Sequence, residues 1–353
     1  MATFNRELLK QLCETPGIPG REDQIRAVVI DEIRPLVDEL SVDVMGNVVG
    51  VKRGNAGPKV MIAAHIDEIG FLVKHIDDQG FIRLQPVGGF DARVLVAQRV
   101  LVHGFGGKVH RGVVQAAAKP IHLLEPGEAK PTKLDDLFVD IGLAVDDVKA
   151  SVEVGDMVTM DRTLETNDEI VMSKSLDDRV GVYVMIEAIR ALQSAEAEIV
   201  AVATTQEEVG LRGARTAAFT QDPDISIALD VTLALDIPGA SAETAVSRIG
   251  KGPAIKIFDS SQLTHPKLVR HVRDVAEHNN IAYQLEILPR GGTDAGAMQL
   301  NKAGSAAITL SIPCRYVHTV NEMASIKDID DAVNLLAAYL KDAGSRSYGY
   351  ETG

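Results

Sequence analysis

The sequence predicts an α/β protein, a mixed sheet with helices on both faces, into which a small all-β domain is inserted. Runs such as 59–67 are apolar on both faces, as in strands that lie between two layers of helices. Helical and strand-like patterns alternate before about residue 70 and again after about residue 165. Between these points, short valine-rich runs alternate with glycine turns and no long helical period appears.

The first part of the chain supplies two helices and three strands to this fold. Residues 8–12 and 25–33 carry apolar side chains at helical spacing, and the Pro- and Gly-rich segment 15–20 separates them. Residues 42–54 predict a β-hairpin around Gly-Asn, and 59–67 predicts a strand in the middle of the sheet.

The pattern predicts two domains from three segments. Residues 1–70 and 166–353 would form the α/β domain, and 71–165 would form an inserted barrel-like β domain. Within the insert, 119–136 carries three prolines and several charges, which predicts an exposed, mobile loop.

After the insert, helices and strands alternate again. The apolar spacing predicts helices over 178–192, 264–279 and 329–340, and strands over 198–205, 224–232, 283–288 and 305–313. Pro266 falls in the first turn of its helix, and Ser325 with Asp328 is expected to cap the last one.

Composition excludes several kinds of protein. Thirty-six Lys and Arg against 50 Asp and Glu give a formal net charge of −14, which would repel a nucleic-acid backbone. No run of about 18 apolar residues could span a membrane, and the start lacks a signal-peptide pattern. Cys13 and Cys314 are too few for a disulfide framework and are expected to be buried, so we expect a cytoplasmic protein.

The first candidate functional residues follow the strand predicted over 59–67. His65 lies near its end, and Asp67, two positions on, would point to the same face. A metal-bound imidazole usually donates its second N–H to a carboxylate or carbonyl, and Asp67 offers that partner. An ordinary hydrogen-bonded pair would give the same pattern.

Two further acidic pairs stand at the ends of predicted elements. Asp177 and Asp178 begin a helix, where the helix dipole favours carboxylates and where one aspartate could also bridge two cations. Glu207 and Glu208 follow a strand and can face one pocket only if the strand has ended in a loop, as Gly210 suggests. A solvated loop end is the alternative for this pair.

Asp230 closes another apolar strand, and His318 follows the strand over 305–313. Two imidazoles and three carboxylates form a donor set that favours zinc, with cobalt or manganese as alternatives. Two divalent ions would offset the three negative charges together with a bridging hydroxide, and Glu207 would remain free to move a proton. The five donors of this set are His65, Asp177, Glu208, Asp230 and His318.

Six motifs spread over 59–319 are together similar to the tetrahedral dodecameric metalloaminopeptidases, a family that includes glutamyl and deblocking aminopeptidases and homologues labelled endoglucanase. The motifs, in chain order, are AAHIDEIGF, SKSLDDRVG, TTQEEVGLRGA, ALDVT, GGTDAGA and RYVHT. The resemblance implies a zinc-peptidase-like catalytic domain and an inserted domain for dimer contacts and for assembly into a dodecamer.

The same resemblance implies a role for each candidate residue. One metal would be held by His65 and Asp230 and the other by Glu208 and His318. Asp177 would bridge the two metals. Glu207 would be the general base, and Asp67 would support the first histidine. The turn at 291–295 would shape the substrate side of the site.

The expected function is therefore hydrolysis of amino-terminal residues from peptides with a free amino end. A glycosidase remains an alternative because Glu207 and Glu208 are paired acids, although sequence neighbours are poorly placed to flank a sugar ring. A non-catalytic assembly subunit with solvated acids is the third hypothesis.

Overall fold

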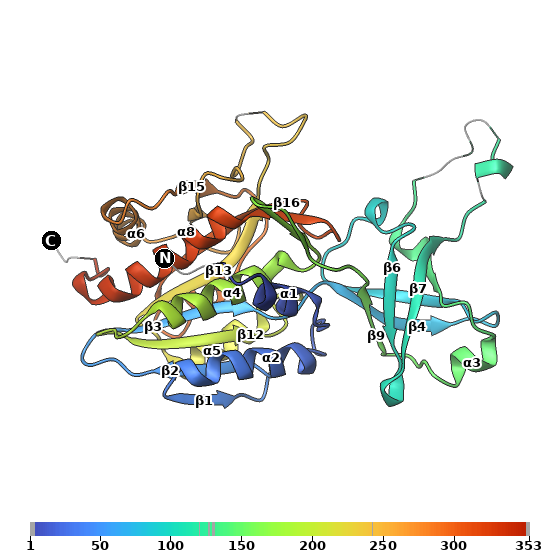
Figure 1. Cartoon of the computed structure of the whole chain (residues 1–353), viewed down its shortest axis with the longest axis horizontal. Helices are drawn as coiled ribbons and strands as arrows, with labels where there is room; N and C mark the ends of the chain where they lie inside the picture. Colours follow the sequence, from blue (N-terminus) through green and yellow to red (C-terminus); the bar gives the residue numbers. More distant parts are fainter. Residues whose placement is uncertain (1–3, 120, 126–127, 129–130, 242, 351–353) are drawn as a thin grey trace.

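The computed structural model describes residues 4–119, 121–125, 128, 131–241 and 243–350. It consists of a layered α/β part and a separate β barrel, which Figure 1 shows side by side. This arrangement confirms the predicted fold class.

A mixed sheet forms the centre of the α/β part. Within the described residues eleven strands pair, nine of them in the order β1-β2-β12-β3-β13-β16-β17-β11-β10, while β14 joins β16 and β15 joins β14. Strands β12, β3, β13 and β16 are parallel to one another, and β3 lies mid-sheet as predicted. The strands are β1 (Glu39–Val42), β2 (Val48–Lys52), β3 (Lys59–His65), β10 (Glu165–Thr166), β11 (Ile170–Ser173), β12 (Glu198–Thr204), β13 (Ile225–Leu233), β14 (Ala254–Phe258), β15 (Gln284–Ile287), β16 (Ala306–Arg315) and β17 (Glu322–Ser325).

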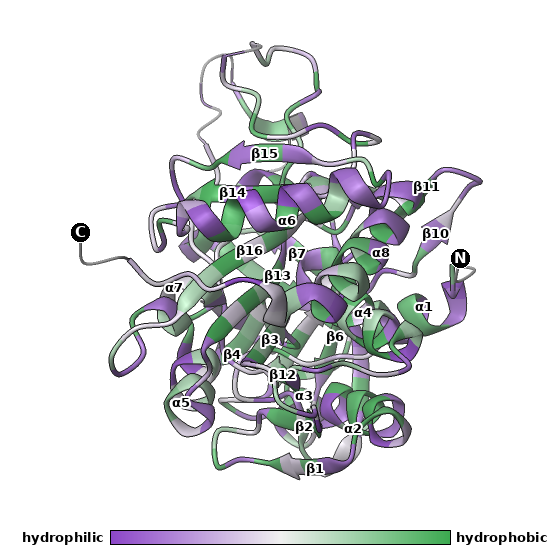
Figure 2. Cartoon of the chain, turned by 90° about the vertical axis from the view of Figure 1, so that its left-hand side faces the viewer, coloured by the Kyte–Doolittle hydropathy of each residue, from purple (hydrophilic) through white to green (hydrophobic). Residues whose placement is uncertain are grey.

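Helices cover both faces of this sheet because its central strands are apolar on both sides. In β3, Ile62 and Ala64 pack into the large core that includes residues of α1, α2, α4, α6 and α8, whereas Met61 and Ala63 pack with α5 and α7. Figure 2 shows α5 and α7 on one side of the sheet and α1, α2 and α4 on the other. The helices are α1 (Arg6–Glu14), α2 (Asp23–Ile33), α4 (Leu176–Ala191), α5 (Arg212–Gln221), α6 (Pro266–His278), α7 (Asp294–Gln299) and α8 (Ile326–Asp342).

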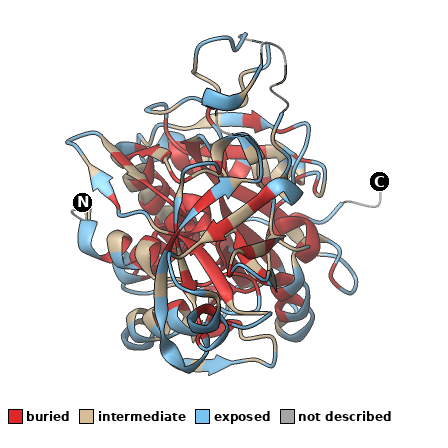
Figure 3. Cartoon of the chain, turned by 90° about the vertical axis from the view of Figure 1, so that its right-hand side faces the viewer, coloured by how far each residue is buried: buried red, intermediate tan, exposed pale blue. Residues whose placement is uncertain are grey.

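The inserted segment folds into a closed barrel with strand order β4-β5-β8-β7-β6-β9. It has a core of its own, in which Phe71, Val100, Val139 and Val158 are buried. In the view of Figure 3, exposed residues lie mostly at the periphery of the chain. The strands and the one helix are β4 (Gly70–Ile76), β5 (Ile82–Val87), β6 (Arg99–His103), β7 (Val109–Ala116), β8 (Leu137–Asp140), β9 (Met157–Met160) and α3 (Val145–Lys149). Short 3-10 turns are η1 (Arg34–Leu36), η2 (Ala92–Val94), η3 (Phe105–Gly107), η4 (Ile121–Leu123), η5 (Leu134–Asp136) and η6 (Ala343–Ser345).

Several details differ from the sequence prediction. The hairpin's first strand starts at Glu39 rather than 42, and the insert contains the short helix α3. Ser325 occupies the N-cap of α8 but makes no side-chain capping bond. Instead, Asp328 accepts bonds from the backbone N–H groups of Gly250 and Gly252, at 2.6 and 2.7 Å. The carboxylate thus satisfies a distant turn rather than its own helix.

The expected surface loop over 119–136 falls partly on residues outside the described ones, namely 120, 126–127 and 129–130. Its described members, such as Lys119 and His122, are mostly exposed. Cys13 and Cys314 are both free and buried, as predicted. Among the described residues, no helix is both long and apolar enough to cross a bilayer.

Candidate metal centre

The candidate site lies where three neighbouring parallel strands reach their carboxyl ends. His65 is the last residue of β3 and pairs with Thr204, the last residue of β12. Asp230 lies on the adjacent strand β13, which continues to Leu233, so this aspartate does not close its strand as the sequence suggested. The carboxyl end of an open α/β sheet is where ligands usually bind.

Asp177 connects the two candidate histidines. It stands in the first turn of α4, after Ser175, whose φ of 59° is left-handed. One carboxylate oxygen lies 3.1 Å from Nε2 of His65, and the other lies 3.4 Å from Nε2 of His318. A carboxylate with an imidazole facing each of its oxygens has the geometry required to bridge two cations.

Asp67 fixes the loop that carries the two glutamates. Beyond Thr204, strand β12 gives way to a loop, as the glycines predicted, and α5 starts at Arg212. Asp67 accepts hydrogen bonds from the backbone N–H groups of Glu207 and Glu208, both at 3.1 Å. As a result, both glutamates can approach the centre although they are adjacent in the chain.

Asp67 also orients His65, but through a different atom from the one expected. The main-chain oxygen of Asp67 lies 3.0 Å from Nδ1 of His65, whereas the carboxylate is 3.7 Å away. Since β3 ends at His65, Asp67 is not on the strand face that the prediction assumed. An Nδ1–H that donates to this carbonyl leaves Nε2 free to bind a metal.

Glu322 and Asp178 support the site, and the sequence analysis did not single out either as a support. Glu322 accepts bonds from the backbone N–H groups of Asp177, at 3.1 Å, and of His318, at 2.8 Å. Asp178 accepts from the backbone N–H of His65 at 3.2 Å. Both carboxylates are buried. The only sequence signal was position, since Asp178 lies within the SKSLDDRVG motif and Glu322 lies three residues after RYVHT.

The predicted donors converge in three overlapping groups whose ligand atoms lie within 4.8 Å of one another. The groups are His65, Asp177 and Asp230; His65, Glu207 and Glu208; and Asp177, Glu208 and His318. Every predicted ligand therefore belongs to at least one group, and the predicted base Glu207 is itself a member of the second group, 3.9 Å from Nε2 of His65. Imidazole nitrogens mixed with carboxylate oxygens suit zinc and similar divalent metals, so the residues fit such ions.

The electrostatics of the cluster also suit cations. Burial raises the pKa of both Glu207 and Asp230 well above the usual range, and for Asp230 the charge of Asp177 adds to this. Burial opposes protonation of His318, but hydrogen bonds to Asp177 and Glu208 outweigh it and raise its pKa to about 12. Without ions, burial therefore favours the neutral forms of the Glu207 and Asp230 carboxyls, and a bound cation would favour their ionised forms.

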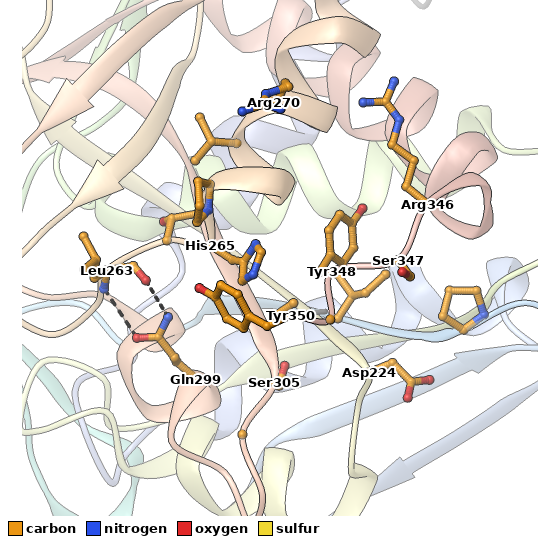
Figure 4. Close-up of a pocket in the computed structure, with 18 of the residues that line it drawn as sticks. Asp224, Leu263, His265, Arg270, Gln299, Ser305, Arg346, Ser347, Tyr348 and Tyr350 are labelled. Atoms are coloured by element: carbon orange, nitrogen blue, oxygen red, sulfur yellow. Dashed lines mark hydrogen bonds between the residues drawn. The ribbon is translucent and has the colours of Figure 1, made fainter. Parts of the chain in front are cut away.

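A large groove lies elsewhere on the α/β part (Figure 4). Its volume is about 1250 Å³, and its walls include His265, Arg270 and Tyr348. Asp224 and Ser305, which also line it, precede strands β13 and β16, so the groove is at the amino ends of the parallel strands. It contains no member of the donor groups and therefore is not the candidate site.

An α/β sheet with imidazole and carboxylate donors gathered at its carboxyl edge is typical of a metal-dependent enzyme. Residues 46–335 match the family model described as M42 glutamyl aminopeptidase. The chain belongs to this family and is a metal-dependent aminopeptidase. The glycosidase and non-catalytic alternatives are thereby set aside.

Relatives and solved structures agree with this membership. The chain is 42% identical to a putative aminopeptidase of Acetivibrio thermocellus, over 94% of this chain and 96% of the relative. It is similar to the structure of an aminopeptidase from Desulfurococcus kamchatkensis, with a TM-score of 0.93, 39% identity and 98% of each chain covered. It is also similar to the TET1 peptidase of Pyrococcus horikoshii, described as assembling into a tetrahedron or an octahedral shell, with a TM-score of 0.85, 33% identity and 95% and 98% coverage.

Proposed function

We propose that this aminopeptidase binds two divalent cations, with zinc favoured over cobalt or manganese. His65 and Asp230 would hold one cation, Glu208 and His318 would hold the other, and Asp177 would bind both. The placement of the two oxygens of Asp177, each facing a different imidazole, is the observation that carries this proposal. When bound, such a pair supplies a water of lowered pKa and polarises the scissile carbonyl.

Glu207 is the proposed general base. It is left over when the five donors are assigned, its side chain is 11% exposed, and it lies 3.9 Å from His65. A buried carboxylate with a raised pKa is suited to take a proton from the attacking water and to pass it to the leaving amine. Asp67 is a positioning residue, since it holds the backbone of both glutamates and the ring of His65.

The proposed substrates are peptides with a free amino terminus. The aminopeptidase family to which the chain belongs supports this substrate class. The reaction removes the amino-terminal residue by hydrolysis of the first peptide bond.

The substitution Glu207→Gln tests the assignment of the base. We expect kcat to fall by about 10²–10⁴, the usual contribution of general acid–base catalysis, with unchanged metal content. The measurement is turnover of an aminoacyl-p-nitroanilide together with elemental analysis, and Glu165→Gln, at an exposed acid of β10, is the matched control. Full turnover by the Glu207 variant would refute the role.

We further propose that residues 1–70 and 166–353 form the catalytic unit and that 71–165 mediates dimer contacts within a dodecamer. The core of the barrel supports this division, although β4 of the barrel begins at Gly70 and β10 of the large sheet begins at Glu165. The relative described as assembling into a tetrahedron supports the assembly. Light scattering should give a mass twelve times that of the chain, and a stable monomer would contradict the proposal. The free, buried cysteines are consistent with a reducing compartment such as the cytoplasm.

A further inference from the structure

Several large apolar side chains are exposed at the end of the α/β part that is opposite the metal centre. Strand β14 runs antiparallel to β16, with Ala254 opposite Ser311, so its last residue, Phe258, lies beside the start of β16. Leu263 forms a β-bridge with Phe258, and Ile287 of β15 also pairs with it. All three side chains are exposed, Leu263 to 65% and Ile287 to 60%. They therefore lie together at the amino ends of the parallel strands.

Helix α7 extends this apolar surface. The side chain of Gln299, the last residue of α7, accepts from the backbone N–H of Leu263 at 3.4 Å and donates to its carbonyl at 2.8 Å (Figure 4). The next residue, Leu300, is 79% exposed, and it lines a groove of about 770 Å³ together with Phe219, which is also exposed. We define the amino-end face by its five exposed side chains, Phe219, Phe258, Leu263, Ile287 and Leu300.

The amino-end face has the features of a surface that contacts another protein. Contiguous apolar surface that is exposed on a protein usually marks contact with another molecule. Among the described strands β15 pairs with β14 alone, so the sheet ends here in an edge strand, which proteins usually protect from unwanted pairing. A substrate at the metal centre would not cover this face, because the centre lies at the carboxyl ends of the same parallel strands.

The proposed dodecamer needs a second kind of contact between copies. A two-fold contact uses the same surface on both copies and closes after two, so contacts between barrels alone would end at a dimer. Larger closed particles need a heterologous contact, in which one surface meets a different surface of the next copy until a ring closes. A tetrahedral arrangement of twelve copies combines two-fold axes with three-fold axes.

The barrel and the amino-end face lie at opposite ends of the chain, so one copy can use both. The barrel segment after β5 reaches the metal centre, since a Cβ at Gly89 would lie 3.2 Å from Nδ1 of His318. The barrel therefore adjoins the carboxyl ends of the parallel strands. Contacts through the barrel leave the amino-end face available for another copy.

The large groove at the amino ends of the strands supplies a complementary surface. Leu263 belongs both to the amino-end face and to the wall of this groove, so the two surfaces are adjacent. Ile257, Val269 and Tyr348 give the groove further apolar walls. A projecting side chain such as Leu300 of a neighbouring copy would find apolar partners there.

We propose that the amino-end face of one copy packs into the large groove of the next, so that three copies of this chain meet around a three-fold axis. The inference rests on the proposed dodecamer, and it assigns to the α/β part the contact that the barrel does not provide. The partner of this face is a second copy of this chain.

Light scattering of three variants tests both sides of the contact. Leu300→Glu and Leu263→Lys place a charge on the amino-end face, and Ala303→Glu places one on the wall of the groove. Because burying a charge without a partner is costly, each variant should fall from twelve chains per particle to two, a sixfold loss of mass. Each should still turn over an aminoacyl-p-nitroanilide, since the metal centre lies at the other end of the strands. Val44→Glu, at a fully exposed position between β1 and β2, is the matched control and should remain dodecameric.

The outcomes separate this inference from the proposed function. A wild type that is a stable monomer or dimer would contradict the proposed dodecamer, and this inference would fail with it. A dodecameric wild type with dodecameric variants would overturn the inference alone, since the face would then be free in the particle. Variants that form trimers would also overturn it, because the face would then belong to the two-fold contact. If only the Ala303 variant stays dodecameric, the face does not pack into the groove.

Discussion

The sheet carries two buried clusters of charged side chains that differ in how their charge is balanced. In one, fully buried Lys256 donates to Glu286 and lies 3.9 Å from Asp259, while Thr232 donates to Glu286 at 2.6 Å. In the other, the candidate metal centre, the ion-pair partners of the ligand carboxylates among the described residues are His65 and His318, and the charge of Lys256 also lowers the pKa of Asp230.

This difference distinguishes a cluster that can stabilise the fold by itself from one that is suited to bind a ligand. The lysine cluster contains its own cation, so it can stabilise the fold without any ligand, although a buried pair contributes little net stability. The metal centre concentrates carboxylates that the chain itself does not neutralise. Burying carboxylates without a compensating charge is costly, and the centre is therefore suited to external cations. Removing a carboxylate from the metal centre and removing the lysine from the other cluster should change the stability in opposite directions.

The largest effect is expected for Asp177→Asn, which would remove the carboxylate proposed to bridge the two ions. Metal content should fall from about two ions to below one per chain, and kcat/KM should fall by about 10³ or more, because metal activation contributes several kcal/mol. Elemental analysis and turnover measure the two effects. Retention of both ions would show that Asp177 is not the shared ligand.

The second prediction concerns the lysine cluster, in which the cation is removed. Lys256→Met should lower the free energy of unfolding by about 3–5 kcal/mol, because Glu286 and Asp259 are then left buried without a cation. Metal content per folded chain should be unchanged. Urea denaturation of chelated protein, at one chain concentration, is the measurement.

The double variant Lys256→Met with Glu286→Gln is the control for that experiment. Neutralising the acid together with the lysine should recover part of the lost stability. If the double variant is as unstable as the sum of the two single variants, packing rather than unpaired charge explains the loss.

The third prediction tests the excess charge of the metal centre through Asp294, the first residue of α7. Burial raises its pKa from 3.8 to about 6, against the lowering effects of the Thr204 hydrogen bond and of His65. A carboxyl with a raised folded-state pKa disfavours folding progressively as pH rises from about 4 to 6, and fully above that. Asp294→Asn should therefore increase the stability of the chelated protein, by about 2 kcal/mol at pH 8, with the gain shrinking toward pH 4.

Urea denaturation at both pH values measures this effect, whose sign is opposite to that of Lys256→Met. A loss of stability at pH 8 would mean that the negative charge of Asp294 is satisfied within the chain. The two clusters would then not differ as argued.

Much of the metal centre could be predicted from the sequence, because the positions of its residues follow from the periodicity of the strands. The apolar run before His65 predicted a mid-sheet strand with this histidine near its end, and Glu207 and Glu208 were predicted to follow another strand. The glycines after Glu208 correctly predicted a loop, which is why adjacent acids could be placed together.

The remaining contacts could not be predicted because they join distant segments through the backbone. Glu322 binds the N–H groups of two site residues, and Asp328 binds a turn some 76 residues earlier. Such carboxylates have no periodic signature, and Asp328 was assigned to its own helix for that reason. The pairing of Lys256 with Glu286 likewise depends on β14 and β15 being neighbours, which no local pattern specifies.

The smallest effect is expected for an ion pair outside both clusters. Lys327 contacts Asp331 one turn along α8, and the lysine side chain is 65% exposed. Lys327→Met should lower the free energy of unfolding by less than about 1 kcal/mol, because water screens the exposed lysine although the Asp331 side chain is only 15% exposed. The same urea measurement checks this. If the loss matched that of Lys256→Met, burial would not be what makes an unpaired carboxylate costly in this fold, and the contrast between the lysine cluster and the metal centre would lose its physical basis.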